Sequence, residues 1–265
     1  MNTTKEHLET LRIQAEEHEV IKADGFKTQE EYVLHLMHQS DYEVAASLAC
    51  AKTVLDLGCN GGYGTNVLGA ACKAVTGVDV SPAAINAAKD KYNSGNLSFL
   101  LVDGLTLPFA SSSYDMVTSF QVIEHLADYD LYFSEIKRVL RPGGLLLLTT
   151  PNAAIRVHPG QKPWNPFHVH EFRASELADL VENHFEFAHV LGQWASETTH
   201  AVEYNRCVNA RGKVHAPKSP IKQLLLKMPR PLIDVARGVR ERLAPKNQTQ
   251  PPEDFLNMHR VEDFC

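Results

Sequence analysis

A glycine-rich turn that follows an acid is the part of this 265-residue sequence best suited to bind a ligand. Residues 53–64 read T-V-L-D-L-G-C-N-G-G-Y-G, so a short apolar run meets Asp56 and then four glycines. Glycine allows positive φ and lets a ligand approach the main chain closely. The pattern of 65–71 is compatible with a helix, whose first amide groups would face that ligand. The sequence therefore predicts a strand, a tight turn and a helix start around a small molecule.

A second acid lies one strand further along the chain. The run A-V-T-G-V-D-V at 74–80 predicts a strand, and Asp79 stands near its end. An acid at the tip of the second strand can bind both hydroxyls of a ribose. Its separation from Asp56 fits one βαβ unit. Ser81 and Pro82 then read as the N-cap and first residue of a helix.

Strands and helices alternate over about 51–150. This alternation predicts a parallel sheet with right-handed crossovers, in which ligands bind beyond the carboxyl ends of the strands. The residues named above all fall at such ends. The expected strands lie at 54–56, 74–80, 97–102, 114–120 and 145–150.

Five motifs in a fixed order make the chain similar to a known family. They are D-L-G-C-N-G-G (56–62), V-D-V-S (78–81), D-G (103–104), Y-D-M-V-T-S-F-Q-V-I-E-H-L (114–126) and V-L-R-P-G-G-L-L-L-L-T-T-P-N (139–152). Together they resemble the class I S-adenosylmethionine-dependent methyltransferases over roughly 50–190. The resemblance implies a Rossmann-like, doubly wound, mostly parallel seven-stranded sheet. Strands at 185–192 and 201–208 would complete it, with the last strand antiparallel.

The resemblance also implies S-adenosyl-L-methionine as cofactor and assigns its contacts. The glycine turn would cradle the amino-acid end, Asp79 would bind the ribose, and the D-G pair would lie by the adenine. The expected cofactor-binding residues are Asp56, Gly58, Asn60, Gly62, Asp79, Val80, Asp103, Gly104 and Gln121. Asn60 stands where the family usually has glycine. Because Asn tolerates the left-handed region, we expect the loop to keep its shape.

The segment 149–173 is the candidate acceptor loop. It holds four prolines and three histidines between a predicted strand and the helix expected at 174–184. A hydroxyl acceptor must lose a proton, and histidine has a pKa near the working pH. The candidate catalytic residues are His170, His168 and His125, with His170 preferred. The alternative is that the H-V-H-E-F run only caps and packs, and that His125 only shapes its loop.

A metal site is an alternative use for some of these residues. Gln121-x-x-Glu124-His125, followed by His168 or His170, is similar to the metal-binding set of the small-RNA 3′-end 2′-O-methyltransferases. Here the first acid is the neutral Gln121, whereas hard cations prefer carboxylates. The sequence therefore predicts no metal.

The favoured function is O-methylation of a small polar acceptor such as a sugar, a lipid-linked glycan or a phenol. The histidine-rich loop and the net charge of −6 motivate it, and the charge disfavours a nucleic-acid partner. Three alternatives stay open. They are a small-molecule N-methyltransferase, a metal-assisted RNA 2′-O-methyltransferase, and a cofactor-binding scaffold without turnover.

Three segments are expected: an N-terminal helical lid (1–50), the cofactor-binding domain (51–209) and a basic C-terminal appendage (210–265). The basic residues of 211–246 would contact a membrane or an anionic substrate, or the appendage would pack on its own protomer or a homodimer partner. Five scattered cysteines without a C-x-x-C pair, and no signal-peptide or membrane-span pattern, favour a cytoplasmic location.

Overall fold

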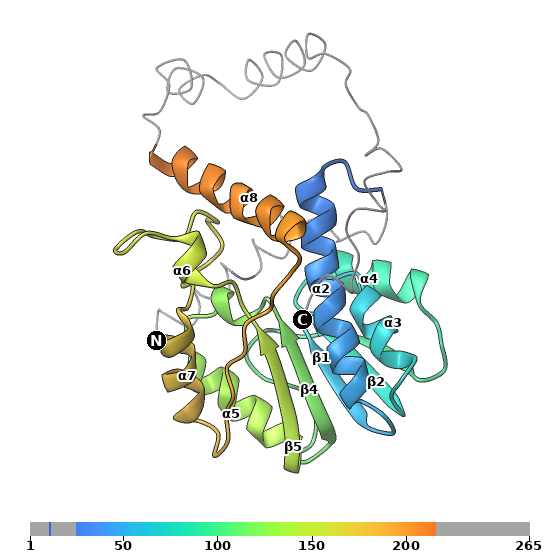
Figure 1. Cartoon of the computed structure of the whole chain (residues 1–265). Helices are drawn as coiled ribbons and strands as arrows, with labels where there is room; N and C mark the ends of the chain where they lie inside the picture. The colour runs from blue at the N-terminus through green and yellow to red at the C-terminus, as the bar shows by residue number, and fades with distance from the viewer. Residues whose placement is uncertain (1–10, 12–24, 216–265) are drawn as a thin grey trace, which may run out of the picture.

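A parallel five-stranded sheet forms the centre of the computed structural model, which describes residue 11 and residues 25–215 (Figure 1). The strand order is β3-β2-β1-β4-β5, and every neighbouring pair is parallel. The order changes direction between β1 and β4, which is where open sheets of this type bind ligands. The strands are β1 (Thr53–Leu57), β2 (Ala74–Asp79), β3 (Leu97–Leu101), β4 (Tyr114–Phe120) and β5 (Leu140–Thr149).

Helices cover both faces of this sheet. In Figure 1, α2 and α3 lie on one side of it, α5 and α7 lie on the other, and α8 crosses above the carboxyl ends of the strands. The helices are α2 (Gln29–Leu48), α3 (Tyr63–Gly69), α4 (Pro82–Lys91), α5 (Tyr129–Val139), α6 (Ala153–Arg156), α7 (Ala174–Glu182) and α8 (Glu197–His215), with a 3₁₀ turn, η1 (Ile123–His125). Among the described residues, none of these helices is long and apolar enough to cross a membrane.

The core has two halves, one on each face of the sheet, because side chains alternate in direction along each strand. Val54 packs with Tyr42 and Tyr63, which come from α2 and α3. The next residue, Leu55, packs on the opposite face in the cluster that contains Ile136 of α5. Successive residues of a strand point to opposite faces, so β1 contributes to both halves of the core. This confirms the Rossmann-like α/β arrangement expected from the alternating pattern.

The two closing strands expected from the family resemblance are wrong in the described part of the chain. Residues 185–192 form no strand, and α8 occupies the segment 201–208. Ser196 caps the start of α8, since its Oγ accepts from Thr199 N–H, and Glu203 pairs with Arg206 one turn on. These contacts favour a helix. Residues 185–192 therefore lack the antiparallel partner on which a strand would depend.

The N-terminal lid falls partly outside the described residues. Its described part is the single helix α2, which begins where Thr28 Oγ1 accepts from Glu31 N–H and which contacts α3 and α8. Residues 216–265 also lie outside the described chain, and α8 runs past the expected boundary at 209/210. The basic surface expected over 211–246 is therefore almost wholly outside it.

Asp56, at the carboxyl end of β1, joins three elements through its side chain. The carboxylate is 0 % exposed and accepts hydrogen bonds from Thr65 of α3, Thr118 of β4 and Tyr42 of α2. Burial raises the pKa of Asp56 to about 6, although these hydroxyls act to lower it. A buried carboxylate is tolerated only when such donors satisfy it, so this contact fixes where the helices meet β1.

We expect Asp56 to make the folded chain less stable as the pH rises from about 4 to about 6. The folded pKa is above the ordinary 3.8, so the folded state keeps a proton that the unfolded state releases. The contribution is on the order of 3 kcal/mol. Urea unfolding over this pH range should show that Asp56→Asn removes that part of the slope.

Asp115→Asn is the matched control. Donation from Thr53 N–H and the Arg141 side chain lowers the pKa of Asp115, so its contribution is lost as the pH falls. This substitution should change the slope with the opposite sign. Equal pH profiles for wild type and Asp56→Asn would contradict the assignment of a buried, titrating Asp56.

Candidate functional site

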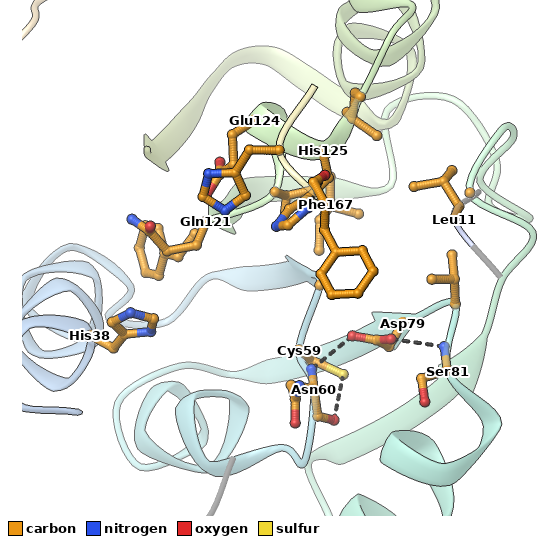
Figure 2. Close-up of a pocket in the computed structure, with 18 of the residues that line it drawn as sticks. Leu11, His38, Cys59, Asn60, Asp79, Ser81, Gln121, Glu124, His125 and Phe167 are labelled. Atoms are coloured by element: carbon orange, nitrogen blue, oxygen red, sulfur yellow. Dashed lines mark hydrogen bonds between the residues drawn. The ribbon is translucent and has the colours of Figure 1, made fainter. Parts of the chain in front are cut away.

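A cavity of about 920 Å³ opens beyond the carboxyl ends of β1, β2 and β4. It is lined by α2, the glycine turn, the ends of β2 and β4, η1, the loop that follows α6, and Arg206 of α8. Figure 2 shows Glu124 and His125 across this cavity from Asp79. The site therefore has two sides, one built by the glycine turn and one by η1 and the loop.

The Asp79 carboxylate is held firmly on the first side. It accepts from the backbone N–H of Asn60 at 2.9 Å and from that of Ser81 at 2.8 Å. Asn60 adopts φ 44°, within the left-handed region that its side chain tolerates. The glycine turn therefore keeps its shape with Asn60 in it, and it holds the acid at the tip of β2 at the edge of the cavity.

Six of the nine expected cofactor-binding residues line the cavity. These are Gly58, Asn60, Asp79, Val80, Gly104 and Gln121. The contacts that the sequence assigned to them stay predictions, but their side chains or backbones are placed to make them.

The other three expected cofactor-binding residues do not line the cavity. Asp56 is turned into the core. Gly62 has φ 80°, and an added Cβ would lie 2.8 Å from both Ala88 Cβ and Phe99 Cε1. Asp103 is on an exposed loop, where its Oδ1 accepts from the N–H of Leu105 and Thr106. Local structure explains the residue types at these three positions. Asp56 and Gly62 hold the glycine turn in place, and Asp103 holds its own loop.

Backbone hydrogen bonds join η1 to the acceptor loop. The carbonyl of Glu124 accepts from the N–H of both Val169 and His170, at 2.8 and 3.2 Å. His125 Nδ1 lies 3.0 Å from the carbonyl oxygen of Phe167. A carbonyl can only accept, so Nδ1 carries the hydrogen and the lone pair of the neutral ring is on Nε2. The expectation that His125 shapes its loop is compatible with this contact, and His125 also lines the cavity.

His168 is held by a buried ion pair. Its Nδ1 lies 2.7 Å from Glu171 Oε1, and Arg156 Nε lies 3.0 Å from Glu171 Oε2. Burial acts to raise the pKa of Glu171, but hydrogen bonds from His168 and Arg156 prevail and lower it. Glu171 is therefore an ionised acceptor, and the lone pair of neutral His168 is also on Nε2.

His170, which the sequence preferred as the base, lies elsewhere. It is about half exposed and lines a second, smaller cavity, with Nε2 3.7 Å from Glu176 Oε2. Both peptide N–H groups after His168 point to the carbonyl of Glu124, so the chain bends and the two histidine side chains separate. His168 is the histidine of this pair that lines the main cavity.

Glu124, His125 and His168 form a compact cluster on the acceptor side of the cavity. Each offers one donor atom, and these atoms all lie within 4.8 Å of one another. Glu124 is 1 % exposed and Thr150 Oγ1 donates to its Oε2 at 3.0 Å. Burial raises the pKa of Glu124 to about 7. Groups of this kind can accept a proton or coordinate a cation.

Sequence reasoning missed several residues of the site. Glu171 belongs to the H-V-H-E-F run and is not among the expected site residues, although its spacing of three from His168 is a usable signal. Arg156 lies over the ring of Trp164, with Cζ 4.1 Å from the ring centroid, and Arg206 came from a segment expected to be a strand. His38 of α2 also lines the cavity, and burial lowers its pKa to about 4.

Comparison with known proteins identifies the domain. Residues 55–148 match the model of the methyltransferase domain family. A probable S-adenosylmethionine-dependent methyltransferase of Mycolicibacterium smegmatis is 38 % identical over 58 % of this chain and 60 % of its own length. A fatty-acid O-methyltransferase of the same organism is 30 % identical over 44 % of this chain and 43 % of its own. The matched part thus spans about half of these relatives.

The fold comparison agrees. The YcgJ protein of Bacillus subtilis superposes with a TM-score of 0.53 at 20 % identity, over 70 % of this chain and 87 % of that one. The two proteins therefore share the same fold. The family match covers the glycine turn, Asp79 and η1, which are some of the segments that line the cavity. Residues 55–148 therefore form a domain similar to that of the S-adenosylmethionine-dependent methyltransferases.

Proposed function

We propose that this protein transfers a methyl group from S-adenosyl-L-methionine to a hydroxyl oxygen of a small polar molecule, such as a sugar, a lipid-linked glycan or a phenol. The observation that carries this proposal is the shape of the cavity. One continuous space joins the Asp79 side to the cluster of Glu124, His125 and His168.

The residues present fit the cofactor. Asp79 presents a carboxylate fixed by two backbone N–H groups, and Gly58 lies where an added Cβ would come within 2.5 Å of Val122 Cγ2. When bound, the cofactor supplies an electrophilic methyl group on a sulfonium. The protein then has to position the acceptor in line with that methyl group.

Oxygen is favoured over nitrogen because the acceptor side is equipped to remove a proton. A hydroxyl must be deprotonated as it attacks, whereas an amine needs only to be neutral. Two imidazoles with Nδ1 committed to acceptors, and one buried carboxylate, face the space where the acceptor would lie. One of the relatives is named as a fatty-acid O-methyltransferase, and this name describes transfer to oxygen.

The walls of the cavity suggest a small acceptor with a flat or apolar part. Trp164 and Phe167 both line it, next to Arg156 and Arg206. A volume of about 920 Å³ lies within the range of ligand pockets, so it suits a cofactor and a compact acceptor.

Asp79→Ala should abolish or strongly weaken cofactor binding. The loss of an ionised hydrogen-bonding partner is worth about 1.5–3 kcal/mol per bond, so we expect the dissociation constant to rise by about 100-fold. Isothermal titration with S-adenosylmethionine measures this. Asp90→Ala is the control, because Asp90 is exposed on α4 and does not line the cavity, and this variant should bind like wild type. Equal affinity of wild type and Asp79→Ala would refute the ribose assignment.

His168→Ala should lower kcat for a hydroxyl acceptor by about 100- to 10,000-fold, because removal of the acceptor proton is impaired. His170→Ala should stay within about twofold of wild type, since that side chain lines the other cavity. Transfer of labelled methyl to a panel of sugars, glycolipids and phenols provides the measurement, with cofactor binding as a check on folding. The opposite ranking of the two variants would show that the base is His170.

A further inference from the structure

The donor atoms of Glu124, His125 and His168 come from two segments that are held together by the main chain. Glu124 and His125 belong to η1, and His168 belongs to the acceptor loop. The carbonyl of Glu124 accepts from two consecutive N–H groups just after His168, which fixes the loop against η1. The cluster is therefore assembled by backbone contacts and does not depend on long surface side chains.

Both imidazoles have the outer partners that are typical of metal-binding histidines. Such histidines donate their second ring N–H to a carbonyl or a carboxylate, which fixes the tautomer and the ring orientation. Here His125 Nδ1 meets the Phe167 carbonyl, and His168 Nδ1 meets the Glu171 carboxylate. In each case the lone pair of the neutral ring is on Nε2.

The third donor, Glu124, also has an outer partner, because Thr150 donates a hydrogen bond to one of its oxygens. Glu171, the partner of His168, is itself paired with Arg156 through its other oxygen. Glu124 is 1 % exposed, and the side chain of His168 is 7 % exposed. Two histidines and one carboxylate with ordered partners, next to an open cavity, match the donor set of catalytic metal sites that keep a position for substrate.

We propose that Glu124, His125 and His168 bind a divalent first-row transition-metal ion, which holds the acceptor oxygen during methyl transfer. The binding site stands on the cluster alone, and only its role in catalysis rests on the proposed function. Gln121, whose neutral amide argued against a metal in the sequence, is not required. Its Nε2 donates to Thr149 Oγ1, and it is not one of the three donors.

The geometry of the cluster and the types of its donor atoms indicate which ions it would bind. Three ligands at about 2.1 Å in a tetrahedral site lie roughly 3.4 Å apart, so the donor atoms must close in from 4.8 Å by about 1.4 Å. Side-chain rotations can supply that movement. Imidazole donors suit Zn²⁺, Fe²⁺, Ni²⁺ and Cu²⁺, and Co²⁺ lies between Fe²⁺ and Ni²⁺ in affinity, whereas Mg²⁺ and Ca²⁺ prefer oxygen ligands.

The bound ion would take the place of a general base, because it would make the acceptor hydroxyl easier to deprotonate. A hydroxyl oxygen on the ion becomes more acidic, as water does on Zn²⁺. The O–H bond breaks and the proton passes to solvent. The oxygen then forms a bond to the methyl carbon while the carbon–sulfur bond breaks, with its electron pair left on sulfur. The products are the methyl ether, S-adenosylhomocysteine and one proton.

The test uses the full chain without a histidine tag, stripped with chelator and titrated with Co²⁺. We expect one ion per chain, with visible absorption bands of a nitrogen- and oxygen-ligated ion, and displacement by Zn²⁺. Mg²⁺ should bind at least about 100-fold more weakly. Glu124→Gln and His168→Ala should each weaken binding by more than about tenfold, as ligand losses do.

His170→Ala is the matched control, because it removes a nearby histidine outside the cluster and should leave the Co²⁺ spectrum unchanged. Absence of a stoichiometric site, or equal loss in His170→Ala, would overturn the proposal. Methyl transfer that is undiminished in chelator would overturn the catalytic role and leave the proposed function intact. Stoichiometric Co²⁺ binding without methyl transfer to any acceptor would instead count against the proposed function.

Discussion

One buried carboxylate fixes the geometry on which this site depends. Asp56 ends β1 without access to solvent, and its oxygens accept from hydroxyls on α2, α3 and β4. A buried charged or polar group is costly unless each of its bonds is made, so the three elements can meet β1 in few other ways. The glycine turn begins two residues later. Its position relative to β2 and β4 is therefore set from within the core and not by the ligand.

The position of the glycine turn and the end of β4 then determine the arrangement of the cavity. The turn places Asn60 so that its N–H donates to the Asp79 carboxylate. β4 ends at Phe120, and the φ of 58° at the following Gln121 turns the chain into η1. The carbonyl of Glu124 then anchors the acceptor loop. Each step involves a main-chain group of the turn, of β4 or of η1. The cofactor side and the acceptor side are thus linked through β1 and β4, which lie next to each other at the switch point of the sheet.

The sequence was most informative where residue type alone limits the backbone. Strand–helix alternation, the glycine turn and the acid after β2 predicted the sheet and one side of the cavity. It could not choose between His168 and His170, because residues two apart point the same way in an extended chain. The choice depends on a long-range contact, the bend imposed by the Glu124 carbonyl. The expected strand at 201–208 is wrong for a similar reason, since the family resemblance does not reveal the contacts of Ser196 and Glu203 that favour a helix there.

Charge balance explains why the acceptor side is built as it is. Glu171 is buried against Arg156 and His168, so its charge is compensated within the protein. Glu124 is equally buried, and the hydrogen bond to its side chain comes from the neutral hydroxyl of Thr150. The charge of Arg156 also acts to lower the pKa of Glu124, but burial prevails. A buried carboxyl group of this kind gains from a positively charged ligand. A cation held by Glu124 would complete the pairing that Arg156 provides for Glu171, with the acceptor oxygen next to it.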